Sequence, residues 1–99
     1  MDQCFLISYD IADNRLRGYF FRKLKKIAIH LQNSVFFYEG NSEKLVHLEM
    51  MFSEKLTAED NVLIMPCPKI SYEDARIYSR KKRSNSELLG TSIFGQDLI

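Results

Sequence analysis

The chain has 99 residues, of which 45% are hydrophobic, and its 14 Lys and Arg against 13 Asp and Glu leave a formal net charge of +1. This length predicts one small domain whose core needs neither disulfides nor a structural metal. No apolar run approaches the roughly 18 residues of a membrane span, and two distant cysteines without a Cys-x-x-Cys pair exclude a zinc site, so we expect a soluble, cytoplasmic protein without membrane contact.

The first predicted element is a buried strand, Cys4 to Ser8, which places the carboxylate of Asp10 at its C-terminal end. Asp13 follows at N-cap spacing for a helix, where its side chain accepts from the free N–H groups of the first turn. The apolar residues of this helix recur at helical spacing, at Leu16, Phe20, Leu24 and Ile27. A carboxylate at a strand tip beside a helix rich in cations is typical of a site that handles phosphates.

The chain beyond this helix predicts a short hairpin, a second helix and a further strand. These elements span Ile29 to Gln32 with Val35 to Glu39, then Glu43 to Leu56, then Val62 to Met65. One long strand with a bulge is the alternative to the hairpin. The order strand, helix, strand, strand, helix, strand predicts an α+β, ferredoxin-like βαββαβ fold with both helices on one face of an antiparallel sheet.

The C-terminal part is less regular. Arg76 to Ser79 predicts a short extra strand, Arg80 to Ser86 is polar, and Leu88 to Phe94 is apolar again. An apolar tail has no place in the core of a complete βαββαβ unit. We therefore expect residues 1–79 to form the ferredoxin-like domain. We expect residues 80–99 to form a tail that packs on another chain, the partner in a dimer.

The near-neutral net charge conceals two basic blocks. Eleven of the 14 Lys and Arg lie between Arg15 and Lys26 or between Arg76 and Arg83, whereas the acids lie mostly between Glu39 and Asp74. A basic face attracts a phosphate backbone whatever the total charge is. Solvated helix faces without a partner are an equally common outcome of such charge runs.

Asp10 is the strongest candidate for chemistry. Its carboxylate suits Mg²⁺ or Mn²⁺, because hard cations take oxygen ligands and keep several waters. One carboxylate is a poor metal site, and a twofold dimer that brings two copies together makes a better one. A strand-end carboxylate that caps the next turn is the alternative.

The basic helix supplies candidates for nucleic-acid contact. Arg15 and Arg17 lie closest to Asp10 and suit bidentate contacts with a phosphate, or else salt bridges with Asp10 or Asp13. Aromatic rings in the strands stack on bases in some proteins, although they more often belong to the core. The full set of candidate nucleic-acid-binding residues is Tyr9, Arg15, Arg17, Arg22, Lys25, Lys26, Ser34 and Phe36.

Four segments together resemble the small CRISPR-associated Cas2 family. They are ISYDIADNRLR, LKKIAIHLQNSVF, NSEKLVHLE and DNVLIMP, in the family's order across Cys4 to Pro66. The tyrosine–aspartate strand end and the Gln-x-Ser-Val-Phe hairpin are together fairly specific. Ala28 stands where members usually have Gly, and Phe37 and Tyr38 stand where a small residue is typical.

The resemblance implies a symmetric homodimer whose C-terminal strands complete the partner's sheet. It implies a role in acquiring new spacers for CRISPR immunity, in complex with the spacer-integrating nuclease of the same system. Members are described as magnesium-dependent endonucleases on RNA or DNA, and the family's metal-binding and catalytic aspartate corresponds to Asp10.

Two functional classes follow for this chain. In one, the dimer is a metal-dependent phosphodiesterase in which paired Asp10 residues hold the ion and Arg17 steadies the phosphate. In the other, the dimer is a non-catalytic scaffold that binds duplex DNA and bridges to the integrase. A third class, a metabolite-sensing regulator, has no pocket signature in the sequence.

Overall fold

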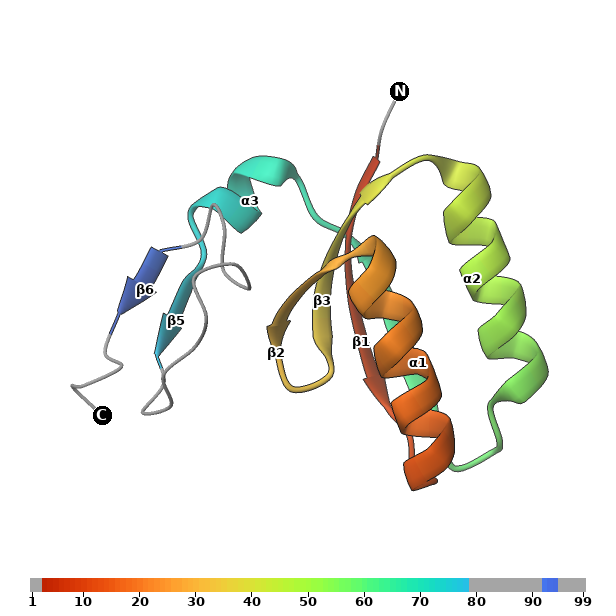
Figure 1. The fold of residues 1–99 in the computed structure, drawn as a ribbon. Coiled ribbons are helices and arrows are strands. Elements are labelled where there is room, and N and C mark those ends of the chain that lie inside the picture. The colour runs from red at the N-terminus through yellow and green to blue at the C-terminus, as the bar shows by residue number, and fades with distance from the viewer. Residues whose placement is uncertain (1–2, 79–91, 95–99) are drawn as a thin grey trace.

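The computed structural model describes residues 3–78 and the backbone of residues 92–94 (Figure 1). The expected domain boundary after residue 79 and the polar segment from Arg80 to Ser86 lie outside the described residues, and so does most of the tail. No helix in the described part of the chain is both long and apolar enough to cross a membrane.

A four-stranded antiparallel sheet with strand order β2-β3-β1-β4 forms the centre of the fold. In chain order the elements are β1 (Gln3–Asp10), α1 (Asn14–Ile27), β2 (Ile29–Gln32), β3 (Val35–Gly40), α2 (Ser42–Lys55) and β4 (Asn61–Pro66). Figure 1 shows α1 and α2 side by side over the same face of this sheet. The βαββαβ order confirms the predicted α+β, ferredoxin-like fold.

Both long helices begin at a side-chain cap, and the cap at Asp13 is the one that the sequence predicts. The Asp13 side chain accepts from the backbone N–H of Leu16 at 2.8 Å, and the Asn41 side chain accepts from Lys44 N–H at 2.9 Å. Each bond satisfies one of the N–H groups that a helix start leaves without a partner. The N-cap Asp13 lies three residues after Asp10, so α1 begins at the end of the sheet where β1 ends.

The main core lies between the two helices and the sheet. Phe20 of α1 stacks on Phe52 of α2 with ring centroids 4.2 Å apart. Ile7 and Phe36 have no exposed surface and pack beneath these rings from β1 and β3. Alternate residues of β1 thus point into this core, which leaves the remaining ones for the opposite face of the sheet.

The C-terminal layer consists of α3 (Lys69–Glu73), β5 (Arg76–Tyr78) and β6 (Ser92–Phe94) (Figure 1), and its α3 and β5 cover part of that opposite face. Tyr72 stacks on Phe37 of the sheet at 4.2 Å, and Ile77 is buried in the same cluster. β5 is the predicted extra C-terminal strand, and it pairs in parallel with β6 of its own chain. The completion of a partner's sheet stays a prediction.

Candidate metal and nucleic-acid site

Asp10 ends β1 on the face of the sheet opposite α1 and α2. Successive side chains of a strand point to opposite faces. Ile7 and Tyr9 pack in the core under the helices, whereas Leu6 contacts the cluster on the other face, so Ser8 and Asp10 share the side of Leu6. Asp10 is exposed, and its carboxylate has no hydrogen bond or ion pair with any residue in the range 3–78. It is therefore available to a ligand.

The strand beside β1 adds apolar side chains to the same face. Because β1 and β4 are antiparallel neighbours, Asp10 lies opposite Asn61, Ser8 opposite Leu63, and Leu6 opposite Met65. Leu63 is 52% exposed and Met65 is 44% exposed. We call these six residues of β1 and β4 the open face. It is an apolar surface with one carboxylate at its edge.

One protomer supplies an incomplete set of metal ligands at this edge. Among the residues the structure describes, no three His, Cys, Asp or Glu side chains lie close enough together to hold a metal ion. Around Asp10 the protein offers that carboxylate and the amide of Asn61, opposite it in register. A hydrated Mg²⁺ is held by one or two carboxylates with several waters. The residues therefore fit Mg²⁺ only when a second donor comes from elsewhere, and the equivalent Asp10 of a second copy would be such a donor.

Asp60 anchors the loop that carries the chain from Asp10 into α1, and the sequence motifs did not single it out. Its Oδ1 accepts from Ala12 N–H at 3.0 Å, while its Oδ2 accepts from the backbone N–H of Thr57 at 2.8 Å and from the Thr57 hydroxyl at 3.1 Å. These bonds to Thr57 and Ala12 lower the pKa of Asp60 below its ordinary value of 3.8. The contact with Ala12 spans 48 positions, so no local pattern indicates it.

We expect Asp60→Asn to destabilise the protein at neutral pH and to remove part of its acid sensitivity. A carboxyl group whose pKa is lower in the folded state adds stability above its unfolded pKa and loses it as pH falls through the folded pKa. The melting temperatures of wild type and variant should therefore differ at pH 7 and converge as the pH falls through the lowered pKa of Asp60. A constant difference from pH 7 to pH 2 would contradict this role of the Asp60 charge.

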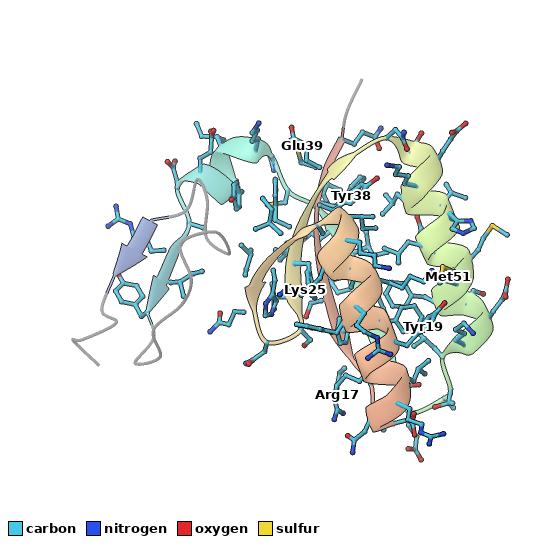
Figure 2. The ribbon with its side chains drawn as sticks, in the orientation of Figure 1. Arg17, Tyr19, Lys25, Tyr38, Glu39 and Met51 are labelled. Carbon is cyan, nitrogen blue, oxygen red and sulfur yellow. The ribbon has the colours of Figure 1, made fainter. Side chains whose placement is uncertain are left out.

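Arg17 turns toward the loop and Tyr9 and makes no ion pair with Asp10. Its Nη1 donates to the Ile11 carbonyl at 2.8 Å, and its Nη2 donates to the Asn14 side chain. Neither Arg15 nor Arg17 pairs with Asp10 or Asp13 in the described part of the chain, so the alternative of a salt bridge is wrong for this protomer. Figure 2 shows Arg17 near the start of α1.

A shallow hollow beside Arg17 joins the helix to the hairpin. It has a volume of about 400 Å³, and its lining is Tyr9, Asn14, Arg17, Gly18, Phe21, Arg22 and Asn33. Burial raises the pKa of the Tyr9 hydroxyl, and the nearby Arg17 charge partly opposes that shift. Gly18 leaves room for Arg22, because a Cβ at Gly18 would lie 3.1 Å from Arg22 Nη1. The guanidinium groups of Arg17 and Arg22 thus face one hollow large enough for a phosphate group.

The outer side of α1 carries the other predicted cations. A second hollow, of about 450 Å³, is lined by Tyr19, Arg22, Lys23, Lys25 and Lys26. The ammonium groups of Lys23 and Lys55 lie 5.6 and 5.1 Å from the centre of the Tyr19 ring, which Figure 2 shows between α1 and α2. We call the exposed cations Arg15, Arg17, Arg22, Lys23, Lys25 and Lys26 the α1 basic surface. It gathers six positive charges on one helix.

The two aromatic candidates lie in the core and offer no face to a base. Tyr9 is 4% exposed and Phe36 has no exposed surface, and their rings stack with centroids 6.2 Å apart. Ser34 is half-buried in the turn between β2 and β3, where its carbonyl accepts from Tyr9 N–H at 3.2 Å. Burial leaves Tyr9 and Phe36 no free ring face for stacking on a base in this protomer, and contact of Ser34 with nucleic acid stays a prediction.

Two comparisons with known proteins indicate the family and the fold. A family model described as CRISPR associated protein Cas2 matches residues 3–75, well over half of the chain. The crystal structure of a hypothetical protein, TT1823, from Thermus thermophilus is similar in fold, with a TM-score of 0.62 and 25% sequence identity over 69% of this chain and 84% of that chain. No curated protein matches the sequence.

Proposed function

Because this chain belongs to the CRISPR-associated Cas2 family, which has a role in CRISPR adaptation, we propose that it acts in spacer acquisition as a homodimer that binds duplex DNA. In this proposal the dimer is a scaffold between the DNA and the spacer-integrating nuclease. The α1 basic surface is the observation that carries it. Six exposed cations on one helix suit a sequence-independent grip on a phosphate backbone.

The open face supports the homodimer. Leu63 and Met65 together expose apolar surface beside the exposed carboxylate of Asp10, and contiguous apolar surface of this kind marks an interaction site. A twofold axis pairs the same patch on both copies. Two open faces in contact would bury the side chains of Leu63 and Met65. The same contact would bring the Asp10 carboxylates of the two copies toward a common site.

The DNA-binding role is tested by its dependence on salt. The affinity for duplex DNA should decrease with salt, and log affinity plotted against log salt has a negative slope. In the double variant Arg22→Gln/Lys25→Gln, we expect this slope to become less steep by about 0.9 for each phosphate that the variant no longer neutralises. Fluorescence anisotropy between low and moderate salt measures both slopes. The expected reduction in affinity should be the same for unrelated DNA sequences, because these side chains bind phosphates.

A matched control removes the same charge elsewhere. Lys69→Gln/Arg76→Gln lowers the net charge equally, on α3 and β5, and should leave the slope close to that of wild type. Lys69 already pairs with Glu39 at 3.3 Å on the far side of the sheet. Equal reductions in both double variants, or a wild-type affinity that does not respond to salt, would contradict a DNA-binding surface on α1.

Metal-dependent cleavage of RNA or DNA is the second candidate function, favoured by the unpaired carboxylate of Asp10. Members of the family are generally metal-dependent, and the two Asp10 residues of a dimer would hold Mg²⁺ or Mn²⁺. A bound ion of this kind polarises a phosphodiester and activates water. In this role Asp10 holds the ion, and the hollow beside Arg17 and Arg22 orients a neighbouring phosphate of the bound RNA or DNA.

A further inference from the structure

Cys4 and Cys67 are far apart in the sequence but are direct neighbours in the fold. The register of β1 with β4 places Phe5 opposite Pro66, so its continuation by one residue places Cys4 opposite Cys67. The backbone N–H of Cys67 donates to the carbonyl of Cys4 at 3.0 Å, which extends the ladder to this pair. Both side chains contact the same apolar cluster on the face opposite α1 and α2.

The spacing of this pair suits a covalent link. Residues at hydrogen-bonded positions of antiparallel strands have Cα atoms roughly 5.5 Å apart, and disulfides usually join Cα atoms about 4.4 to 6.8 Å apart. Both thiols are half-buried and line one hollow of about 460 Å³ at the edge of the sheet. A small disulfide can therefore reach them from solvent.

Charged side chains of both signs lie near Cys4, because Glu39 is opposite it in register and pairs with Lys69. Lys69 lies at this end of the sheet, where its pKa is raised mainly by Glu39 and to a smaller degree by Cys4. Figure 2 labels Glu39 here, close to the start of β1. The thiolate is the species that attacks a disulfide, whichever of the two cysteines forms it.

We propose that Cys4 and Cys67 form a redox pair that closes an intrachain disulfide and so fastens the start of β1 to the junction between β4 and α3. This inference goes beyond DNA binding and dimerisation. The oxidant is a small-molecule disulfide such as oxidised glutathione. One protein thiolate attacks it and releases one glutathione thiolate, and the second cysteine then displaces the bound glutathione. Two protein thiols are oxidised, and one glutathione disulfide is reduced to two thiols.

The bond would act on the C-terminal layer, because Cys67 lies between two prolines where the chain passes from β4 into that layer. Pro68, the next residue, accepts from Ser71 N–H at 2.9 Å and from Tyr72 N–H at 3.4 Å at the start of α3. A link from Cys67 to β1 would therefore hold α3, and with it Tyr72, against its own sheet. A disulfide that is partly exposed is also open to reduction, as a reversible link requires.

Intact-mass spectrometry after treatment of the reduced, folded protein with oxidised glutathione tests the pair. We expect the wild type to lose two hydrogens and to retain no glutathione, with a Cys4–Cys67 crosslink in the peptide map. Cys4→Ser and Cys67→Ser should each stop with one glutathione attached. Retention of glutathione by the wild type, or a crosslink between two chains, would overturn the proposal.

A comparison with the unfolded wild type keeps the test decisive if a serine variant does not fold. In urea the two thiols lose their alignment, so the ratio of closed to glutathione-bound protein should fall at least about tenfold. An equal ratio in the folded and unfolded protein would overturn the proposal. Hydrogen exchange of the Tyr72 amide should slow at least about tenfold on closure, and unchanged exchange would refute the fastening of the C-terminal layer.

Discussion

Asp10→Ala is expected to lower metal-dependent cleavage of RNA or DNA by roughly a thousandfold, because a bound metal contributes several kcal/mol to such a reaction. The fold should be unaffected, since Asp10 is exposed and its carboxylate has no hydrogen bond or ion pair in the described part of the chain. Cleavage assays with and without Mg²⁺ measure the decrease. Spacer uptake in cells that carry the rest of the system measures the biological role separately.

Asp13→Asn provides a matched control. Asp13 is a second exposed carboxylate in the same loop, and Asn replaces it as an N-cap with little loss of stability. This variant should cleave as the wild type does. If the Asp10→Ala variant cleaves nucleic acid as fast as the wild type, Asp10 is not the residue that binds the catalytic metal ion. If it no longer cleaves but keeps spacer uptake, the scaffold is the physiological function and cleavage is incidental.

Met65→Glu is expected to dissociate the homodimer and to raise its dissociation constant at least about 100-fold. Met65 is an exposed residue of β4 on the open face, opposite Leu6 in register. Pairing two open faces would bury two new carboxylates without partners, and like charges in an interface cost several kcal/mol. Sedimentation velocity across a range of protein concentrations measures the change.

Met50→Glu is the control for this variant. Met50 has a similar exposure, 54% against 44% for Met65, but it lies on α2 on the other side of the molecule. It should leave the dimer intact. Dissociation by Met50→Glu and not by Met65→Glu would move the interface to α2, and a wild-type chain that sediments as a monomer would refute the homodimer itself.

Most of the fold could be predicted because its determinants are local. Asp13 and Asn41 cap the two long helices, and the apolar residues of each helix recur at a spacing that one buried face requires. α3 could not be predicted, since its five residues are too few to show a period and they follow a proline-rich junction. Its position depends on the stacking of Tyr72 on Phe37, a contact between distant segments.

The candidate site could be predicted less completely. Its cations form a recognisable block in the sequence, and the structure leaves all six of them exposed on α1. The direction of Arg17 was not predictable, because the Ile11 carbonyl and the Asn14 side chain compete with Asp10 for its donors. The role of Asp60 was likewise hidden, because its partner Ala12 belongs to another loop.

The amino-acid sequence by itself determined the order of the elements, the helix starts, the position of Asp10 at a strand end and the family to which the chain belongs. The tertiary structure decided which side chains meet. It placed Asp10 beside Leu63 and Met65 on the open face, put Tyr9 and Phe36 in the core, and set Cys4 opposite Cys67. The reason is physical: helix caps and apolar periods act over a few residues, whereas strand register joins residues at any separation and sets the face of every side chain.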